Sequence, residues 1–260
     1  MISPDVTEPM RSLLVSAGLD TLNGAFALSM GRELNKPNLG SRRRTRLELT
    51  DSAGRLHVVY LKRYGPEPLK ARVRRLMENA VPIGPALVEA GNITTAARLG
   101  VTQMRALAWG QTGQRGYLVI AESPGESLER IGAGERGKSW GDGFRLASLL
   151  SSLAWRLHGA GYVHRDFYAC HVFLHKGQVS LIDLARMFKP RWFNRRWRVK
   201  DLAQLHYSMG EYLSSEHWSR LVKDYASSSG DEPGRLARSI ERKSARIRRG
   251  VDRRRRRASQ

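Results

Sequence analysis

The chain has 260 residues, 41% of them hydrophobic and 27% charged, which is ordinary for a globular protein with one domain or two small lobes. Its 45 Lys and Arg against 24 Asp and Glu give a formal net charge of +21, which predicts a polyanionic partner: nucleic acid, an anionic membrane surface or a phosphorylated glycolipid. The single cysteine, Cys170, excludes an internal disulfide and fits a reducing compartment.

The N-terminal residues do not have the pattern of a targeting segment. Asp5 and Glu8 come early, and no basic region precedes an apolar run, so we expect no secretory signal there. No stretch approaches the roughly 18 consecutive apolar residues of a membrane-spanning helix. We therefore expect a cytoplasmic protein, or one attached peripherally to a membrane from the cytoplasmic side.

The first half of the chain has the pattern of a sheet with interspersed helices. Runs rich in β-branched, aromatic and leucine residues predict strands, and turn residues or prolines separate them. Helices are predicted up to a following Gly or Pro. In chain order we expect strands at 45–50 and 56–61 joined by a turn at 51–54, a helical stretch broken at Pro82 and Pro85, a helix over 86–99 and a strand at 116–120.

The second half is predicted to be mostly helical, beginning at a Ser-Pro-Gly hinge over 123–125. We expect a helix over 144–158, a strand at 179–182 and helices over 201–212 and 216–225. From Arg235 onward twelve basic and two acidic residues repel one another, which favours disorder or marginal helicity. Together the elements predict an α+β, two-lobed fold: a β-rich N-terminal lobe over 1–120, a helical catalytic lobe over 121–230 and a basic tail over 231–260.

The motif His164-Arg165-Asp166 and the later Asp183 have the layout of a kinase catalytic loop followed by a metal-binding loop. Phosphoryl transfer needs a carboxylate to orient the attacking hydroxyl and ligands to hold Mg²⁺ against the ATP phosphates. Asp166 suits the first role and Asp183 the second, and short apolar strands around them predict a rigid hairpin. The alternative is an accidental His-Arg-Asp in a helix-to-strand loop.

Further residues complete this set. His171 stands five residues after Asp166, where protein kinases have a metal-binding Asn, and a neutral imidazole is a less usual ligand of Mg²⁺ than an oxygen. Lys62 ends an apolar strand, as a lysine that binds the α- and β-phosphates does, and Glu89 in the following helix is placed to pair with it. Gly40 lies where a phosphate-covering loop belongs. A surface lysine and an exposed helical glutamate are the alternatives.

Taken in order, these parts resemble the lipopolysaccharide kinase (Kdo/WaaP) family over roughly residues 24–213. The resemblance is carried by the segments 40–49, 60–64, 164–174, 181–184 and 196–205. Its most specific elements are the Cys170-His171 pair and the stretch Trp-Arg-Val-Lys-Asp-Leu-Ala at 197–203.

The resemblance implies a protein-kinase-like fold and an ATP- and Mg²⁺-dependent kinase that acts on a heptose or Kdo sugar of the lipopolysaccharide inner core. It implies the cytoplasmic face of the inner membrane as the site of action. It makes His171 an expected metal ligand, and it makes Asp201 the buried carboxylate that supports the catalytic loop together with His164 and Arg165. A helix N-cap is the alternative for Asp201.

The segment 186–198 interleaves basic and aromatic residues. Guanidinium groups bind phosphate in two-pronged fashion, and aromatic rings lie well on sugars or at a membrane interface. We expect acceptor binding by Arg186, Arg195, Arg196 and Arg198. Aromatic core packing and nucleic-acid binding are the alternatives for this segment.

The sequence therefore predicts an inner-core sugar kinase whose partners are a phosphorylated glycolipid and an anionic membrane surface rather than nucleic acid. One alternative is a kinase of the same fold with another glycan, a small molecule or a protein side chain as acceptor. The other is a catalytically silent kinase-like module that binds nucleic acid through its basic surface. An intact set of Lys62, Asp166 and Asp183 argues against the silent module, which has no need of it.

Overall fold

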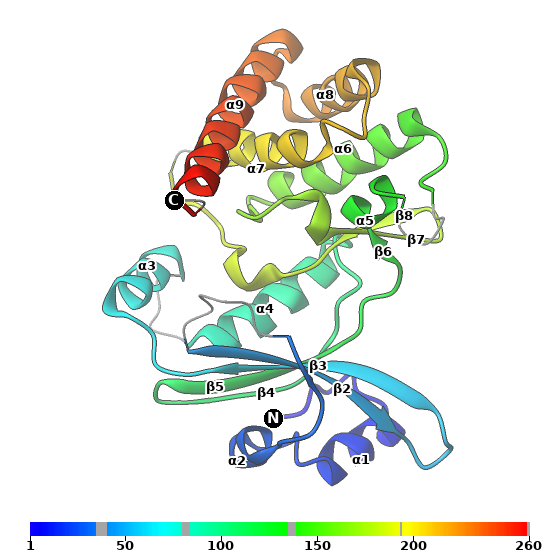
Figure 1. Ribbon diagram of the computed structural model, residues 1–260, viewed down its shortest axis with the longest axis vertical. Coiled ribbons are helices and arrows are strands. Elements are labelled where there is room, and N and C mark those ends of the chain that lie inside the picture. The colour runs from blue at the N-terminus through cyan, green and yellow to red at the C-terminus, as the bar shows by residue number, and fades with distance from the viewer. Residues whose placement is uncertain (35–40, 80–83, 135–138, 193, 259–260) are drawn as a thin grey trace. The chain divides into compact units, whose positions relative to one another are not determined.

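The computed structural model describes residues 1–34, 41–79, 84–134, 139–192 and 194–258 (Figure 1). They form two compact units, one of Met1–Arg98 with Met104–Ser123 and the other of Leu99–Gln103 with Pro124–Gln260. The short segment Leu99–Gln103 joins the second unit because it pairs there with Leu181, whose backbone nitrogen donates to Val101 and whose carbonyl accepts from the Thr102 hydroxyl. The expected α+β fold with a sheet in one part and helices in the other is confirmed.

The first unit is built on an antiparallel sheet with the strand order β1-β2-β3-β5-β4. Its strands are β1 Arg32–Glu33, β2 Arg42–Thr50, β3 Leu56–Tyr64, β4 Ala106–Thr112 and β5 Arg115–Ala121. The predicted hairpin is present, and its turn is closed by Asp51, whose Oδ1 accepts from the backbone nitrogens of Ala53 and Arg55, both at 2.9 Å. The contact of its carboxylate with Nε2 of His57 at 2.9 Å, and next the hydrogen bond from the Arg55 backbone, hold the pKa of Asp51 well below its usual range.

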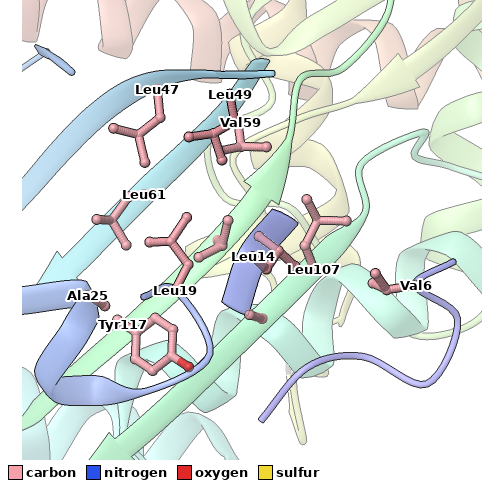
Figure 2. Close-up of a cluster of buried hydrophobic side chains, with 12 residues drawn as sticks. Val6, Leu14, Leu19, Ala25, Leu47, Leu49, Val59, Leu61, Leu107 and Tyr117 are labelled. Atoms are coloured by element: carbon pink, nitrogen blue, oxygen red, sulfur yellow. The ribbon is translucent and has the colours of Figure 1, made fainter. Parts of the chain in front are cut away.

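The two faces of this sheet are covered by different helices (Figure 1). Side chains alternate along a strand, so Val59 and Leu61 of β3 lie on one face of the sheet and Lys62 and Tyr64 lie on the other. The first face packs with Leu47 against residues of α1 (Glu8–Ser16) and α2 (Leu22–Ala27), as Figure 2 shows. On the second face lies α4 (Pro85–Arg98). The sequence did not predict α1, α2 or strand β4, while α3 (Leu69–Asn79) and α4 match the predicted helices.

The second unit combines a small antiparallel sheet, β6-β7-β8, with a set of helices. Its elements are β6 Glu126–Ser127, α5 Leu128–Gly132, α6 Gly143–Gly159, a 3₁₀ turn Ala169–His171, β7 Val172–His175, β8 Gln178–Leu181, a 3₁₀ turn Leu184–Arg186, α7 Asn194–Met209, α8 Ser215–Ser229 and α9 Pro233–Ala258. The helix predicted over 144–158 is α6, and Leu146, Leu150, Leu153 and Leu157 form its buried stripe. The predicted strand at 179–182 is β8.

Two predictions for the second unit are wrong. The helix predicted over 201–212, α7, begins earlier, at Asn194, so Asp201 lies fully buried in the helix interior and the alternative of an N-cap does not hold. The basic tail is also no disordered segment over its described residues. Its Leu236, Ile240 and Ser244 recur every four residues, are buried, and turn one face of α9 toward the neighbouring helices. Burial of Leu236 and Ile240 stabilises the helix against charge repulsion, and the arginines of α9 are exposed on its other faces.

The start of α9 is set by Glu232. Its carboxylate accepts from the backbone nitrogens of Gly234 at 2.7 Å and Arg235 at 2.6 Å, which caps the first turn. Further along, the Ser244 hydroxyl lies 3.0 Å from Nδ1 of His206 in α7. Among the described residues, no helix is both long and apolar enough to cross a membrane.

Candidate active site

The loop that carries Asp166 is held by a buried carboxylate. Oδ2 of Asp201 accepts from the backbone nitrogen of His164 at 2.6 Å, and Oδ1 accepts from that of Arg165 at 2.8 Å. Nε2 of His158 lies 3.3 Å from Oδ2, so this fully buried carboxylate is surrounded by hydrogen-bonding groups that offset the cost of its burial. Arg165 has a positive φ of 72°, a backbone conformation that the surrounding hydrogen bonds maintain.

The same face of α7 supplies two more contacts to this loop. Gln204 accepts from the backbone nitrogen of Phe167 at 3.1 Å and donates to the Arg165 carbonyl at 2.7 Å. The Ser208 hydroxyl accepts from the backbone nitrogen of Ala169 at 2.8 Å. Asp201, Gln204 and Ser208 share one helix face because they are three and four residues apart. Gln204 and Ser208 were not among the predicted site residues, although their polar spacing after Asp201 was a signal for them.

His164 links the loop to the segment that carries Asp183. Its Nε2 lies 2.9 Å from the Ile182 carbonyl, and since a carbonyl only accepts, Nε2 carries the proton. Burial lowers the pKa of His164, which fits a neutral ring. The other nitrogen, Nδ1, finds no hydrogen-bond partner in the described part of the chain, as a neutral imidazole without a second proton permits.

His171 and Asp183 face each other with the chemistry of a cation site. Nδ1 of His171 lies 2.7 Å from the Asp166 carbonyl and therefore carries a proton, so a neutral ring has its lone pair on Nε2. Nε2 lies 3.8 Å from Oδ2 of Asp183, and a neutral His171 therefore presents a second electron-pair donor beside that carboxylate. Asp183 adopts the left-handed conformation, with φ 56° and ψ 61°, two residues after the end of β8.

The fit to Mg²⁺ is that of a site shared with a substrate. The described residues contain no group of three or more His, Cys, Asp and Glu side chains placed to hold a metal. Mg²⁺ is commonly bound by one or two protein ligands, with waters and substrate phosphates completing its octahedron. The pair of His171 and Asp183 suits a cation held in this way.

The Asp166 carboxylate is itself paired. Nη1 of Arg186 lies 2.8 Å from Oδ1 and 3.0 Å from Oδ2 of Asp166, and both side chains are partly exposed. Arg186 ends the 3₁₀ turn that follows Asp183, so the segment after Asp183 supplies a cation to the Asp166 carboxylate. Arg186 was predicted to bind the acceptor, and its pairing with Asp166 was not predicted.

In the first unit, Lys62 and Glu89 come together as expected from their spacing in a strand and a following helix. Nζ of Lys62 lies 2.5 Å from Oε1 of Glu89, whose side chain is buried. The Tyr64 hydroxyl donates to the other oxygen, Oε2. Tyr64 was missed, although it lies two residues after Lys62 and thus on the same face of β3. Gly40 lies outside the described residues.

The comparison with protein families decides the family. The model of the lipopolysaccharide kinase (Kdo/WaaP) family matches residues 38–225. The chain belongs to this family. Membership makes the protein a kinase, a phosphotransferase of lipopolysaccharide biosynthesis, and it confirms the resemblance read from the motifs.

Individual relatives with a name share only about three residues in ten with this chain. A protein of Escherichia coli K12 named lipopolysaccharide core heptose(I) kinase WaaP is 29% identical over 209 residues, which cover 72% of this chain and 75% of the relative. A protein of the same name from Pseudomonas aeruginosa is 30% identical over 151 residues, covering 52% of this chain and 56% of the relative. Among solved structures, that of WbdD is similar with a TM-score of 0.48 and 20% identity, covering 82% of this chain and 45% of that one.

The basic segment of this lipopolysaccharide kinase family member divides into packed and exposed parts. Phe188 and Trp197 pack edge to face at 5.2 Å, and the Arg165 guanidinium lies over both rings. Aromatic packing, one of the alternatives for this segment, is therefore present for these two rings. Trp192, in contrast, is 71% exposed.

The arginines of the segment divide in the same way. Asp231 accepts from Nε of Arg195 at 3.0 Å and lies 3.8 Å from Nη2 of Arg198. These two guanidinium groups join the first turns of α7 to the connection between α8 and α9. Arg196 is exposed on the surface of α7. An anionic acceptor would therefore meet Arg196 directly, whereas it would compete with Asp231 for Arg195 and Arg198.

Proposed function

We propose that this protein is an ATP-dependent kinase that phosphorylates a heptose or Kdo sugar of the lipopolysaccharide inner core. The observation that carries the proposal is the arrangement in the second unit, where a braced loop presents Asp166 and where His171 and Asp183 face each other. The family and the heptose kinases among the relatives support a core sugar as acceptor.

In this proposal Asp166 orients the acceptor hydroxyl for in-line attack on the γ-phosphorus of ATP. The bond from the acceptor oxygen to phosphorus forms while the bond to the bridging oxygen of the departing ADP breaks, and the hydroxyl proton passes to Asp166. His171 and Asp183 would hold Mg²⁺, which when bound neutralises charge on the phosphate oxygens. Lys62, oriented by Glu89 and Tyr64, is proposed to bind the α- and β-phosphates.

The basic residues of the segment 186–198 are proposed to contact the acceptor according to how exposed each side chain is. Arg196 and Trp192 offer an exposed guanidinium and an exposed ring to a phosphorylated sugar, and Arg186 lies beside the proposed catalytic carboxylate. We propose Arg195 and Arg198 as secondary contacts, since Asp231 already occupies them. Together these four arginines concentrate positive charge on the second unit, which suits an anionic glycan.

The site of action is proposed to be the cytoplasmic face of the inner membrane. Each surface Lys or Arg gains about 1 kcal/mol near an anionic leaflet, and the exposed arginines of α9 offer many such contacts. This accounts for the net charge of +21 without nucleic acid.

The test is genetic and chemical. Lipopolysaccharide core from cells that lack the gene is compared by mass spectrometry with core from the parent and from cells complemented with the wild type or Asp166→Asn. We expect one phosphate to be lost and restored by the wild type alone. An unchanged phosphate pattern would remove the core sugar as acceptor, and incubating the purified protein with labelled ATP and other glycans, small molecules or proteins would then identify the alternative.

A further inference from the structure

One nitrogen of Arg186 spans the Asp166 carboxylate, at 2.8 Å from Oδ1 and 3.0 Å from Oδ2. A guanidinium carries five N–H donors in a planar fork, and the contact to Asp166 uses one nitrogen of that fork. The Arg186 side chain is 42% exposed and that of Asp166 is 23% exposed, so both remain accessible to a substrate. The carboxylate proposed to orient the acceptor is therefore in direct contact with a permanent cation that a substrate can also reach.

The backbone around Arg186 is held at both ends. On one side the 3₁₀ turn begins at Asp183, and Met187 closes it by donating to the Leu184 carbonyl at 3.1 Å. On the other side Phe188 and Val163 exchange two backbone hydrogen bonds of 3.0 and 3.1 Å, directly before the His164-Arg165-Asp166 loop. Arg186 is thus fixed between the metal-loop aspartate and the catalytic loop, which is the preorganisation that electrostatic catalysis requires.

The charges nearby leave room for an anion. The pKa of Lys200 is lowered by burial and by the guanidinium groups of Arg165 and Arg186, while Asp201 and Asp166 act in the opposite direction. Asp201 is already engaged by the loop backbone. Arg165, Arg186 and Lys200 therefore lie within electrostatic reach of one another, and Arg186 is the one that contacts the Asp166 carboxylate directly.

We propose that Arg186 is a catalytic residue that donates hydrogen bonds to the phosphoryl group during its transfer, an inference that rests on the proposed kinase function. An acceptor oxygen bound to Asp166 lies about 3 Å from the carboxylate, and the attacked phosphorus lies about 3–3.5 Å farther on. A guanidinium in contact with the same carboxylate reaches the equatorial phosphoryl oxygens from there. Charge spread over these oxygens in the transition state is what an arginine stabilises.

Two other roles are distinguishable from this one. If Arg186 only binds the acceptor, its removal raises the acceptor KM and leaves kcat unchanged. If it only positions Asp166, its removal has no further effect once Asp166 is replaced. If Arg186 contacts the transferred phosphoryl group, its removal instead lowers kcat at unchanged KM values, with or without the Asp166 carboxylate.

The experiment measures kcat, the ATP KM and the acceptor KM of the purified full chain with a dephosphorylated core oligosaccharide, for R186Q, D166N and the double variant. We expect R186Q to lower kcat by a factor of about 10²–10³, as loss of one transition-state donor does, with both KM values within about threefold. The same loss should recur in the D166N background, followed under single-turnover conditions. R186K, which keeps the charge without the fork, should recover part of the rate and covers the case in which R186Q folds poorly.

The matched control is R220Q, because Arg220 also pairs with an aspartate, Asp224, at 2.9 Å in the second unit. It should retain the wild-type kcat. An unchanged kcat in R186Q, a change confined to the acceptor KM, or no effect in the D166N background would each overturn the inference. Failure of the wild type itself to phosphorylate the oligosaccharide would instead remove the proposed function, so the two outcomes are distinct.

Discussion

Asp166 is the residue on which the proposed chemistry depends most directly. Asp166→Asn keeps the shape of the side chain and its contact with solvent but removes the charge that orients the acceptor hydroxyl. We expect turnover to fall by a factor on the order of 10²–10⁴ while nucleotide binding and the melting temperature stay close to wild type. Steady-state kinetics with nucleotide titration is the measurement, and near-normal turnover would remove Asp166 from the catalytic role.

Asp183 and His171 are expected to differ in how they respond to replacement. Asp183→Asn suits the left-handed backbone at this position but removes the charge, so Mg²⁺-dependent nucleotide binding should be lost or strongly weakened. His171→Asn offers Mg²⁺ an oxygen ligand and should retain that binding, whereas His171→Leu should not.

The measurement for this pair is a titration of Mg²⁺ against bound nucleotide. Unaltered metal dependence in Asp183→Asn would reduce Asp183 to a residue that ends a strand. Equal behaviour of His171→Asn and His171→Leu would contradict the assignment of His171 as a metal ligand.

At the scale of elements, α7 matters because it supports the catalytic loop through side chains rather than through packing alone. Gln204→Ala would leave the Phe167 N–H and the Arg165 carbonyl without this partner in a buried position, at about 1–3 kcal/mol each. We expect a loss of a few kcal/mol in the free energy of unfolding and a fall in turnover. Gln178→Ala, at an exposed position of β8, is the control and should do neither.

Urea denaturation followed by activity at low urea separates the two effects of Gln204→Ala. If stability falls while kcat at saturating substrates is unchanged, α7 only stabilises the fold. Restoration of kcat by Gln204→Glu would not be expected, because a carboxylate cannot donate to the Arg165 carbonyl.

Helix α9 is the other element whose role the structure changes. Ile240 is fully buried, so Ile240→Ala should destabilise the protein by about 2–5 kcal/mol. Arg238→Ala, on an exposed position of the same helix, should be nearly neutral. Thermal or urea unfolding of the two variants is the check, and equal stability of Ile240→Ala and the wild type would mean that α9 does not pack as described. Deleting the chain from Arg235 onward would remove this packed helix together with its arginines, so the deletion would not isolate their effect on membrane binding.

At the scale of the whole molecule, the charge of +21 is the dominant property. Replacing the exposed Arg253, Arg254, Arg256 and Arg257 by Gln leaves the buried face of α9 intact. We expect weaker binding to phosphatidylglycerol vesicles and unchanged turnover on a water-soluble core fragment, since the proposed catalytic residues lie elsewhere in the chain. Added salt should weaken vesicle binding of the wild type, because exposed charges are screened over about 8–10 Å near physiological ionic strength.

The same variant distinguishes the nucleic-acid alternative. A protein that neutralises phosphates with arginines loses affinity for RNA or DNA steeply with salt, and removing four arginines flattens that slope. Tight nucleic-acid binding that resists competitors, together with no response to vesicles, would contradict the membrane proposal. Vesicle binding that the variant loses, with no comparable nucleic-acid affinity, would support it.

The sequence by itself determined the family, the fold class and the central catalytic candidates. Asp166, His171 and Asp183 lie within one short stretch of chain, where spacing and flanking apolar strands are local properties that the residue order carries. The hairpin of β2 and β3, helix α4 and helix α6 were predictable for the same reason.

Only the tertiary structure decided which distant groups complete this set. The bonds from Asp201 and Gln204 to the catalytic loop join residues more than thirty positions apart, and they depend on how α7 packs rather than on any local pattern. The pairing of Arg186 with Asp166 could not be predicted, because the sequence does not show whether an arginine faces solvent or a carboxylate. The helical state of α9 could not be predicted either, because it depends on the burial of Leu236 and Ile240 against other helices. Long-range burial and side-chain to backbone hydrogen bonds supply that distinction, and they exist only in the folded chain.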